Sequence, residues 1–318
     1  MTTTAAAIAG TTEPTIRVQG LTRRFGTTNA VDDLSFDVAR GELFGLVGPD
    51  GAGKTTTLRM LAGVLKPSSG DAVLGGVSVV HDPEGVKHEI AYMSQRFGLY
   101  ADLTVLENLH FYADLYRVPK RERAARLERL FQFSNLAPFK DRLAGKLSGG
   151  MKQKLGLSCA LIHQPKILLL DEPTFGVDPI SRRDLWLIVH DMVAQGVTVV
   201  VSTAYMDEAE RFDRVALLHQ GKLLALDAPV ALQRALAGEV LVVLVEPARA
   251  ARDLLRAHPR VRRAALFGDK LHVTVASVAD DGPLIDTALR EAGLVPSDMH
   301  GAPPSMEDVF IERMTEAA

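Results

Sequence analysis

Hydrophobic residues fall into short runs or period-two patterns in two parts of the chain. Such runs predict β-strands, and they lie at residues 15–18, 30–38 and 42–47 and again at 167–170 and 197–202. A helical pattern is expected to begin at about Lys54 and to run to about Leu65, before Pro67 and Gly70. Short buried strands that alternate with helices predict a mostly parallel α/β sheet.

The periodicity becomes helical between about residue 103 and residue 164. Asp102 or Thr104 could cap one helix there, and Pro119 could begin the next. A helical block between two strands of one sheet predicts an inserted helical subdomain, placed at about 96–165. Charges of both signs fill 120–129, which a solvated helix face explains better than a binding site.

A second, smaller α/β domain is expected to begin near Gly238. Its predicted strands and helices alternate, with strands at 241–245, 261–267 and 271–275 and helices at 248–257 and 284–291. The 318 residues therefore divide into a flexible tail at 1–14, a large domain at 15–237 and a small domain at 238–318.

Composition narrows the possible partners and compartments. The 36 basic and 39 acidic residues give a net charge of −3, so we expect no nucleic-acid partner. The single cysteine, Cys159, lies in an apolar stretch, which predicts a buried inert thiol in a reducing compartment. The longest apolar runs are strand-sized, and no Lys or Arg precedes Arg17, so neither a membrane span nor a secretory signal is expected.

The strongest chemical signal is the run Gly-Pro-Asp-Gly-Ala-Gly-Lys-Thr at 48–55, between a predicted strand and a predicted helix. Its glycines let successive backbone N–H groups point at phosphate oxygens, and the helix N-terminus adds partial positive charge. Lys54 would bind the β- and γ-phosphates, and the Thr55 hydroxyl would bind Mg²⁺. The candidate ATP-binding residues here are Gly48, Asp50, Gly51, Ala52, Gly53, Lys54, Thr55 and Thr56.

Two carboxylates, Asp171 and Glu172, follow the apolar run at 167–170. Ligands bind at the carboxyl ends of strands in open α/β sheets. Asp171 would hold Mg²⁺, and Glu172 would act as general base toward the attacking water. By itself the pair could equally be a strand followed by an acidic helix cap, but the phosphate loop favours the catalytic interpretation.

The run Leu-Ser-Gly-Gly-Met-Lys-Gln at 147–153 makes a resemblance specific. The chain resembles the nucleotide-binding subunit of ATP-binding cassette (ABC) transporters. The resemblance implies that Ser148, Gly149 and Gly150 contact the γ-phosphate of ATP held by a partner cassette. The number of residues between Lys54 and Ser148 suits a helical subdomain. It is too small for the long coiled-coil arms that chromosome-organising relatives carry at this point.

Further motifs match the same family over about residues 15–235. Phe25 stands where an aromatic ring stacks on adenine, although it could be a core aromatic. Gln95 matches the glutamine that joins Mg²⁺ and water to the membrane subunits, although it could be a plain surface residue. Asp178, in Gly-Val-Asp-Pro, matches the loop that crosses the dimer interface. The implied fold is a P-loop ABC cassette with a RecA-like core, an antiparallel β part and the helical subdomain.

The C-terminal part resembles exporter-type cassettes similar to the daunorubicin-resistance ATPase, which carry a small α/β unit and a segment like Ser-Met-Glu-Asp-Val-Phe-Ile at 305–311. The resemblance implies transmembrane permease subunits and a second cassette as partners. It also implies a cytoplasmic location, peripheral on the inner face of the cell membrane. Two alternatives stay open: a soluble ABC ATPase of translation or repair, and a regulatory ATP sensor with little turnover.

One position departs from the family pattern. The family has a histidine after the strand equivalent to 197–201, where this chain has Ala204 in Ser-Thr-Ala-Tyr-Met. That histidine touches the γ-phosphate and orients water, which alanine cannot do. Either the residue was substituted to trap ATP, or the chain is one half of an asymmetric pair of cassettes; the exporter resemblance favours the second. Slow turnover is therefore expected for the chain alone.

Overall fold

The computed structural model describes residues 13–95 and 98–316, so the tail expected at 1–14 falls almost wholly outside the described residues. The chain divides into two compact units, the first ending at Leu224 and the second beginning at Ala225. We expected the second unit to begin near residue 238. It begins earlier because α8 (Pro229–Arg234) packs on the C-terminal helix α11 (Met306–Glu316).

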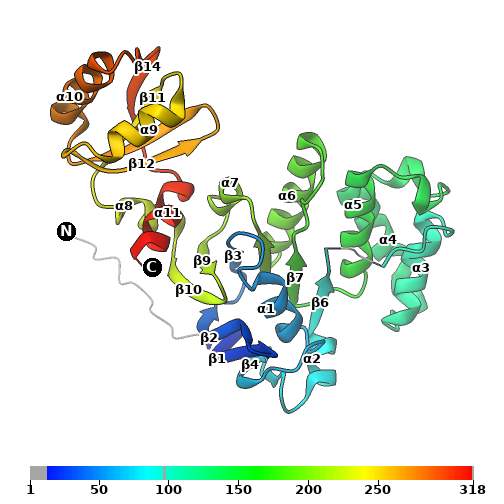
Figure 1. Ribbon diagram of the computed structural model, residues 1–318. Coiled ribbons are helices and arrows are strands. Elements are labelled where there is room, and N and C mark those ends of the chain that lie inside the picture. The colour runs from blue at the N-terminus through cyan, green and yellow to red at the C-terminus, as the bar shows by residue number, and fades with distance from the viewer. Residues whose placement is uncertain (1–12, 96–97, 317–318) are drawn as a thin grey trace, which may run out of the picture. The chain divides into compact units, whose positions relative to one another are not determined.

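A six-stranded sheet forms the centre of the first unit (Figure 1). Its order is β10 (Lys222–Asp227), β9 (Arg214–His219), β3 (Leu43–Val47), β8 (Thr198–Thr203), β7 (Ile167–Asp171) and β6 (Ile90–Met93). The pairs from β9 to β6 are parallel. Strands β3, β7 and β8 are wholly buried, which explains their continuous apolar sequences.

A second, antiparallel sheet in this unit has the order β2 (Thr28–Val38), β1 (Ile16–Phe25), β4 (Ser69–Leu74) and β5 (Val77–Ser78). The strand predicted at 15–18 extends to Phe25, because β1 pairs with β2 along its whole length through several register shifts. The parallel part was predicted from the sequence pattern, and the antiparallel part was implied by the family resemblance.

The helices of this unit are α1 (Lys54–Leu61), α2 (Pro83–Glu89), α3 (Val105–Leu115), α4 (Lys120–Ser134), α5 (Gly149–Leu161), α6 (Pro179–Ala194) and α7 (Met206–Ala209), with 3₁₀ turns at Ala137–Phe139 and Ala144–Lys146. Helices α3 and α4 pack on α5 rather than on a sheet, within the stretch predicted as a helical subdomain at about 96–165. Thr104 caps α3 in a capping box with Glu107, and Pro119 immediately precedes α4, as predicted. Helix α1 ends at Leu61 rather than near Leu65, because the amides of Val64 and Leu65 turn back to the Arg59 carbonyl.

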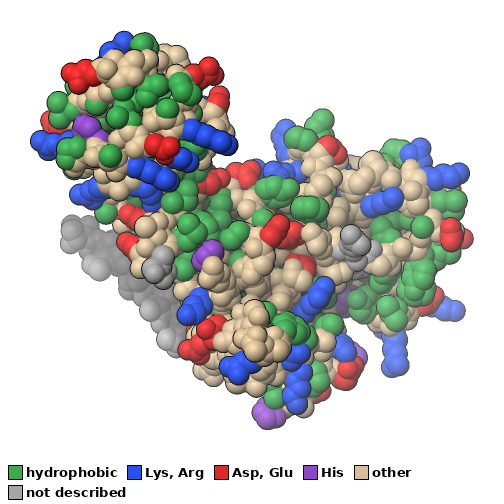
Figure 2. Space-filling model, in the orientation of Figure 1, with side chains coloured by type: hydrophobic (Ala, Val, Ile, Leu, Met, Phe, Trp, Pro, Cys, Tyr) green, Lys and Arg blue, Asp and Glu red, His purple; other side chains and the backbone are tan. Residues whose placement is uncertain are grey.

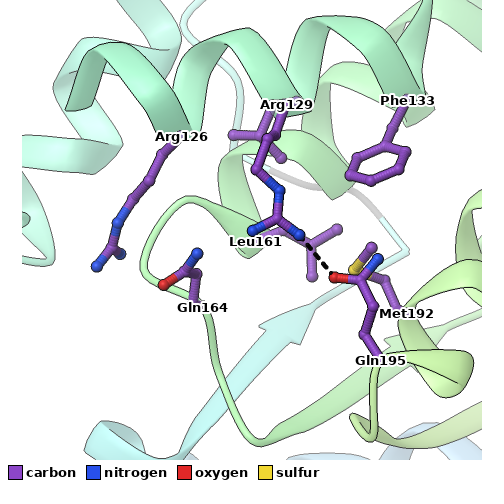
Figure 3. Close-up of a pocket in the computed structure, with 8 residues that line it drawn as sticks. Arg126, Arg129, Phe133, Leu161, Gln164, Met192 and Gln195 are labelled. Atoms are coloured by element: carbon purple, nitrogen blue, oxygen red, sulfur yellow. Dashed lines mark hydrogen bonds between the residues drawn. The ribbon is translucent and has the colours of Figure 1, made fainter. Parts of the chain in front are cut away.

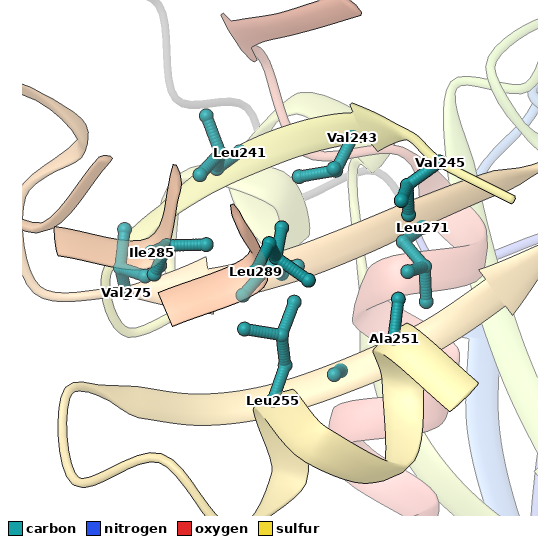
Figure 4. Close-up of a cluster of buried hydrophobic side chains, with 11 residues drawn as sticks. Leu241, Val243, Val245, Ala251, Leu255, Leu271, Val275, Ile285 and Leu289 are labelled. Carbon is teal, nitrogen blue, oxygen red and sulfur yellow. The ribbon is translucent and has the colours of Figure 1, made fainter. Parts of the chain in front are cut away.

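The second unit has the chain order β11 (Glu239–Leu244), α9 (Ala248–Arg256), β12 (Val261–Phe267), β13 (Lys270–Val275), α10 (Val278–Glu291) and β14 (Asp298–Ala302). Its antiparallel sheet has the order β12-β13-β11-β14, the ferredoxin-like arrangement. Apolar side chains of the sheet and of α9 and α10 form one core (Figure 4), among them Leu241, Val243, Leu255, Val273 and Leu289. The three predicted strands and the helix predicted at 248–257 are confirmed. The helix predicted at 284–291 begins earlier, at Val278, because Ser277 caps it, and α8, β14 and α11 were not predicted.

Cysteine burial, surface charge and helix hydrophobicity concern the chain as a whole. Cys159 is buried, and burial raises the pKa of its thiol, which keeps the thiol protonated. Basic and acidic side chains are interspersed over the face shown in Figure 2, in keeping with the small net charge. Within residues 13–95 and 98–316, no helix has the length and hydrophobicity needed to cross a membrane.

Candidate phosphate-binding and catalytic site

The loop between β3 and α1 wraps around the Lys54 side chain. Gly53 has a φ of 103°, and a Cβ atom there would lie 2.5 Å from the Ala30 carbonyl oxygen, so only glycine fits. The buried Lys54 ammonium donates to the carbonyl oxygens of Gly48 at 2.7 Å and Pro49 at 3.0 Å. The loop thus holds one fixed positive charge at the N-terminus of α1, where the helix dipole also favours an anion.

Asp171 ends strand β7 beside the first turn of α1. Its Oδ1 atom accepts from the hydroxyls of Thr55 at 2.8 Å and Ser202 at 2.7 Å, and its Oδ2 atom accepts from the Tyr92 hydroxyl at 3.3 Å. Burial, helped by the charge of Asp171, raises the pKa of Tyr92 to about 12, so Tyr92 remains a donor at neutral pH. These contacts bring Thr55 and Asp171, predicted together as magnesium ligands, into direct contact.

Glu172 adopts a left-handed backbone conformation with φ of 49°, which is uncommon for a residue other than glycine. Its amide donates to the Ser202 hydroxyl at 3.0 Å and to the Ser202 carbonyl at 3.1 Å, which fixes this conformation. Its Oε1 atom lies 3.3 Å from Lys54 Nζ, and its Oε2 atom accepts from Gln95 Nε2 at 3.0 Å. Two residues far apart in the sequence, Lys54 and Gln95, therefore converge on the Glu172 carboxylate.

A cavity of about 440 Å³ opens at this point. Its lining combines the phosphate loop with the catalytic candidates: Ala30, Asp50, Gly51, Ala52, Gly53, Lys54, Thr55, Thr56, Gln95, Glu172 and Phe175. Sequence reasoning missed Ala30 and Phe175, and it missed Ser202 and Tyr92 behind Asp171. Phe175 could have been noticed, since it is a large apolar residue directly between Glu172 and the Gly-Val-Asp-Pro run.

The donor atoms here fit a hard divalent cation. A hydroxyl from Thr55, an amide from Gln95 and a carboxylate from Asp171 are the oxygen-bearing groups that Mg²⁺ prefers. In the part of the chain that the structure describes, no group of three or more His, Cys, Asp or Glu side chains could hold a metal ion by itself. Such a site suits Mg²⁺, which is usually bound by one or two carboxylates together with substrate phosphates.

The Ser-Gly-Gly run lies at the start of α5. Ser148 caps the helix by accepting from the Met151 amide at 3.3 Å, and both Ser148 and Gly149 are exposed. Gly150 is buried, since a Cβ atom there would lie 2.2 Å from the Ser181 hydroxyl. Asp178 caps α6, and hydrogen bonding from the Ser181 backbone amide lowers the pKa of Asp178. Ser148, Gly149, Gly150 and Asp178 are not among the described residues that line the 440 Å³ cavity beside the phosphate loop.

Phe25 ends β1 and is 49% exposed, so it is not a core aromatic. The Arg23 guanidinium lies 4.6 Å from the centre of its ring, and Phe25 is not among the described residues that line the cavity. Stacking of Phe25 on adenine stays a prediction.

The segment that contains Ala204 begins where β8 ends, beside the phosphate loop. The Gly48 amide donates to the Thr203 carbonyl at 3.3 Å, and Val47 pairs with Thr203 across the two strands. Ala204 itself is half-buried. Residue 204 therefore directly follows Thr203, whose carbonyl is hydrogen-bonded to the phosphate loop.

A different cavity, of about 140 Å³, lies between α4 and α6 (Figure 3). Arg129 donates to the Gln195 amide oxygen at 2.9 Å across it, and Leu161 and Met192 contribute apolar surface. Arg126, in the charged run at 120–129, donates to the Ile162 carbonyl at 3.0 Å. This run is thus only partly a solvated face, because two of its arginines also tie α4 to neighbouring segments.

Comparison with known proteins supports the interpretation of these motifs. Residues 31–175 match the family model described as "ABC transporter". The chain is 43% identical over 302 residues to the probable multidrug ABC transporter ATP-binding protein YbhF of Escherichia coli strain K12, covering 93% of this chain and 51% of that protein. The chain thus spans about half the length of this relative.

Two other matches cover most of the related chain. The daunorubicin resistance ATP-binding protein DrrA2 of Streptomyces coeruleorubidus is 31% identical over 301 residues, covering 93% of this chain and 94% of that protein. A solved structure described as the ATP binding subunit of an ABC transporter is 30% identical with a TM-score of 0.63, covering 69% of this chain and 92% of that chain. The predicted fold and the predicted exporter resemblance are confirmed, and the chain belongs to the ATP-binding cassette proteins of the ABC transporter family.

Proposed function

We propose that the chain is the ATP-binding and hydrolysing subunit of an ABC exporter, which drives efflux through separate membrane subunits. The convergence of Lys54, Glu172 and Gln95 at the phosphate loop carries this proposal. The names of the similar multidrug and daunorubicin resistance proteins favour an exporter over a soluble ATPase of translation or repair.

Each residue of the site has a distinct role in the proposed reaction. Lys54 and the loop amides bind the β- and γ-phosphates of ATP. Thr55, Asp171 and Gln95 hold Mg²⁺, which when bound neutralises phosphate charge. Glu172 accepts a proton from the water that attacks the γ-phosphate, and its contacts with Lys54 and Gln95 hold the carboxylate at the cavity.

A second cassette would complete the site. Ser148 and Gly149 are exposed at a helix N-terminus, where they suit the γ-phosphate of ATP held by a facing cassette. ATP would hold the two cassettes together, and closure would reorient the membrane subunits. Ala204 weakens this chain's own site, whereas Ser148 to Gly150 would still serve the partner's site.

The membrane subunits would dock near Gln95 to Thr104, which places the protein in the cytoplasm at the inner face of the membrane. A cavity of about 270 Å³ supports this position, since Gln95, Leu99, Ala101, Lys152 and Gln153 are among its lining residues. Arg96 and Phe97 lie outside the described residues. A change at the docked surface could reach the Glu172 carboxylate through Gln95.

Reconstitution tests this proposal. The chain is combined with lipid vesicles that contain a candidate six-span permease, and ATP hydrolysis is compared with and without the permease. We expect turnover to rise when the permease is present. The proposal is wrong if the chain does not bind these vesicles and instead associates with ribosomes or DNA in a salt-sensitive manner, as a translation or repair ATPase would.

A further inference from the structure

The segment after β8 is held by a buried carboxylate. Glu208 is 1% exposed and lies in helix α7. Its Oε2 atom accepts from the Thr203 hydroxyl at 2.6 Å, and its Oε1 atom accepts from Trp186 Nε1 at 3.2 Å. The Thr203 hydroxyl in turn accepts from the Tyr205 amide at 3.0 Å. Ala204 therefore lies between two residues whose positions these bonds fix.

Helix α6 contributes a second side chain to this arrangement besides Trp186. Arg182 Nε lies 3.1 Å from Glu208 Oε1, and the Arg182 guanidinium carbon lies 4.2 Å from the centre of the Tyr205 ring. Burying a carboxylate without a cationic partner is costly, and the contact with Arg182 offsets that cost for Glu208. The planar guanidinium can form an ion pair and stack on a ring at the same time, which a lysine ammonium cannot do.

The same turns of α6 also contact the start of α5. Ser181, next to Arg182, lies against Gly150, and Asp184 pairs with Lys154 at 2.5 Å. Through Arg182, helix α6 thus contacts the segment 203–208. Through Ser181 and Asp184, it contacts helix α5, which the Ser-Gly-Gly run begins. Movement of α5 can reach the segment beside the phosphate loop through a few direct contacts.

We propose that Arg182 is a positioning residue, which links the start of α6 to the segment 203–208 and so sets the place of residue 204 beside the phosphate loop. This inference rests on the proposed ATPase function. Through Arg182, the state of the Ser-Gly-Gly helix would control the place of the 203–204 backbone. Because the Thr203 carbonyl accepts from the Gly48 amide of the phosphate loop, this would set how the γ-phosphate meets the attacking water. Arg182 itself would touch neither nucleotide nor water.

Turnover of purified protein gives the first test. Arg182→Gln removes the charge and the stacking group, and Arg183→Gln makes the same change at the neighbouring exposed position. Because small displacements of reacting groups cost up to about 10² in rate, we expect turnover to fall about tenfold or more in Arg182→Gln, with KM for Mg-ATP within about twofold. Arg183→Gln should behave as wild type. Tyr205→Leu should lower turnover, whereas Tyr205→Phe should keep turnover near that of wild type, because Phe retains the ring that Arg182 contacts.

Tryptophan fluorescence gives a second test that does not depend on turnover. Trp186 is the single tryptophan and donates a hydrogen bond to Glu208, so its emission reports on the contacts of Glu208 and Arg182. We expect Mg-ATP to change Trp186 emission in wild type and in Arg183→Gln, and to change it far less in Arg182→Gln. ATP binding, measured separately with a labelled nucleotide, should be the same in all three proteins.

These measurements distinguish the positioning role of Arg182 from the proposed ATPase function. Wild-type turnover and a wild-type emission change in folded Arg182→Gln would overturn the positioning role while leaving the ATPase function intact. Failure of wild type itself to bind labelled ATP would overturn the proposed function. Should Arg182→Gln unfold, the Tyr205→Leu and Tyr205→Phe pair decides, because Tyr205 is 37% exposed and its ring is not part of the core; equal turnover in that pair contradicts the proposal.

Discussion

Lys54 Nζ lies 3.3 Å from Glu172 Oε1, so the cation of the phosphate loop after β3 faces the carboxylate that directly follows β7, two strands away in the sheet. The two residues are far apart in the sequence, and the parallel pairing of β3, β8 and β7 brings their strand ends to one edge of the sheet. An ATP γ-phosphate bound by Lys54 would therefore lie next to the proposed general base.

Lys54→Ala should abolish measurable ATP affinity, because it removes the one fixed positive charge that the loop carbonyls hold in place. Equilibrium binding of a labelled ATP analogue measures the effect. Lys66→Ala, at an exposed lysine of the same unit, is the control and should bind as wild type. Unchanged affinity in Lys54→Ala would mean that the loop has been misassigned.

Ser148→Arg should leave ATP binding by the monomer nearly intact and block turnover that depends on two cassettes. The reason is that Ser148 is exposed and is not among the described residues that line the chain's own cavity. Affinity is measured on the monomer and hydrolysis in the assembled complex, with Ser69→Arg as an exposed control. Loss of monomer binding would instead place the Ser-Gly-Gly run in the chain's own site.

Much of the fold and of the site followed from local sequence patterns. The phosphate loop, Asp171 and Glu172 were predictable because each follows a short apolar run that predicts a buried strand, and because the loop motif favoured a catalytic role for the two carboxylates. Ser202 and Tyr92 were not, because their roles depend on strand order, which brings them to Asp171 from β8 and β6. Strand β14 was missed since Asp-Met-His-Gly-Ala has no β-branched residue, and only pairing with β11 makes it a strand.

Asp308→Asn should loosen α11 in the second unit. Burial would raise the pKa of Asp308, but hydrogen bonds from His272 and from the Ser305 amide and hydroxyl outweigh it and lower the pKa. A lowered carboxyl pKa contributes stability above the unfolded value near 3.9, and this contribution is lost as pH falls through the folded pKa.

We therefore expect Asp308→Asn to reduce the opening free energy of α11 by about 2 kcal/mol at pH 7, with the difference shrinking below about pH 4. Amide hydrogen exchange, corrected for intrinsic rates, measures it. Asp298→Asn removes an exposed carboxylate that also pairs with a histidine, His300, and should have little effect. An equal effect of the two substitutions at pH 7 would contradict the role given to Asp308.

Ala204→His should accelerate ATP hydrolysis with little change in ATP affinity. Lys54 and the loop amides already bind the nucleotide, so a histidine at 204 would act mainly on the γ-phosphate and water in the transition state. Positioned groups of this kind are worth about 10² to 10⁴ in rate, and we expect less if pairing with a second cassette also limits turnover. A wild-type rate typical of complete cassettes, unchanged by the histidine, would show that another group has taken over this role.

The proposed ATPase activity of this chain depends on the site formed by Lys54 and Glu172. Its most direct test is the rate of phosphate release at saturating Mg-ATP for wild type and Glu172→Gln, with equal nucleotide affinity verified for both. Glutamine keeps the size of the side chain but cannot act as a base, so we predict slow turnover in wild type and a loss of at least about 10² in Glu172→Gln. Equal rates of phosphate release in the two proteins would contradict the account.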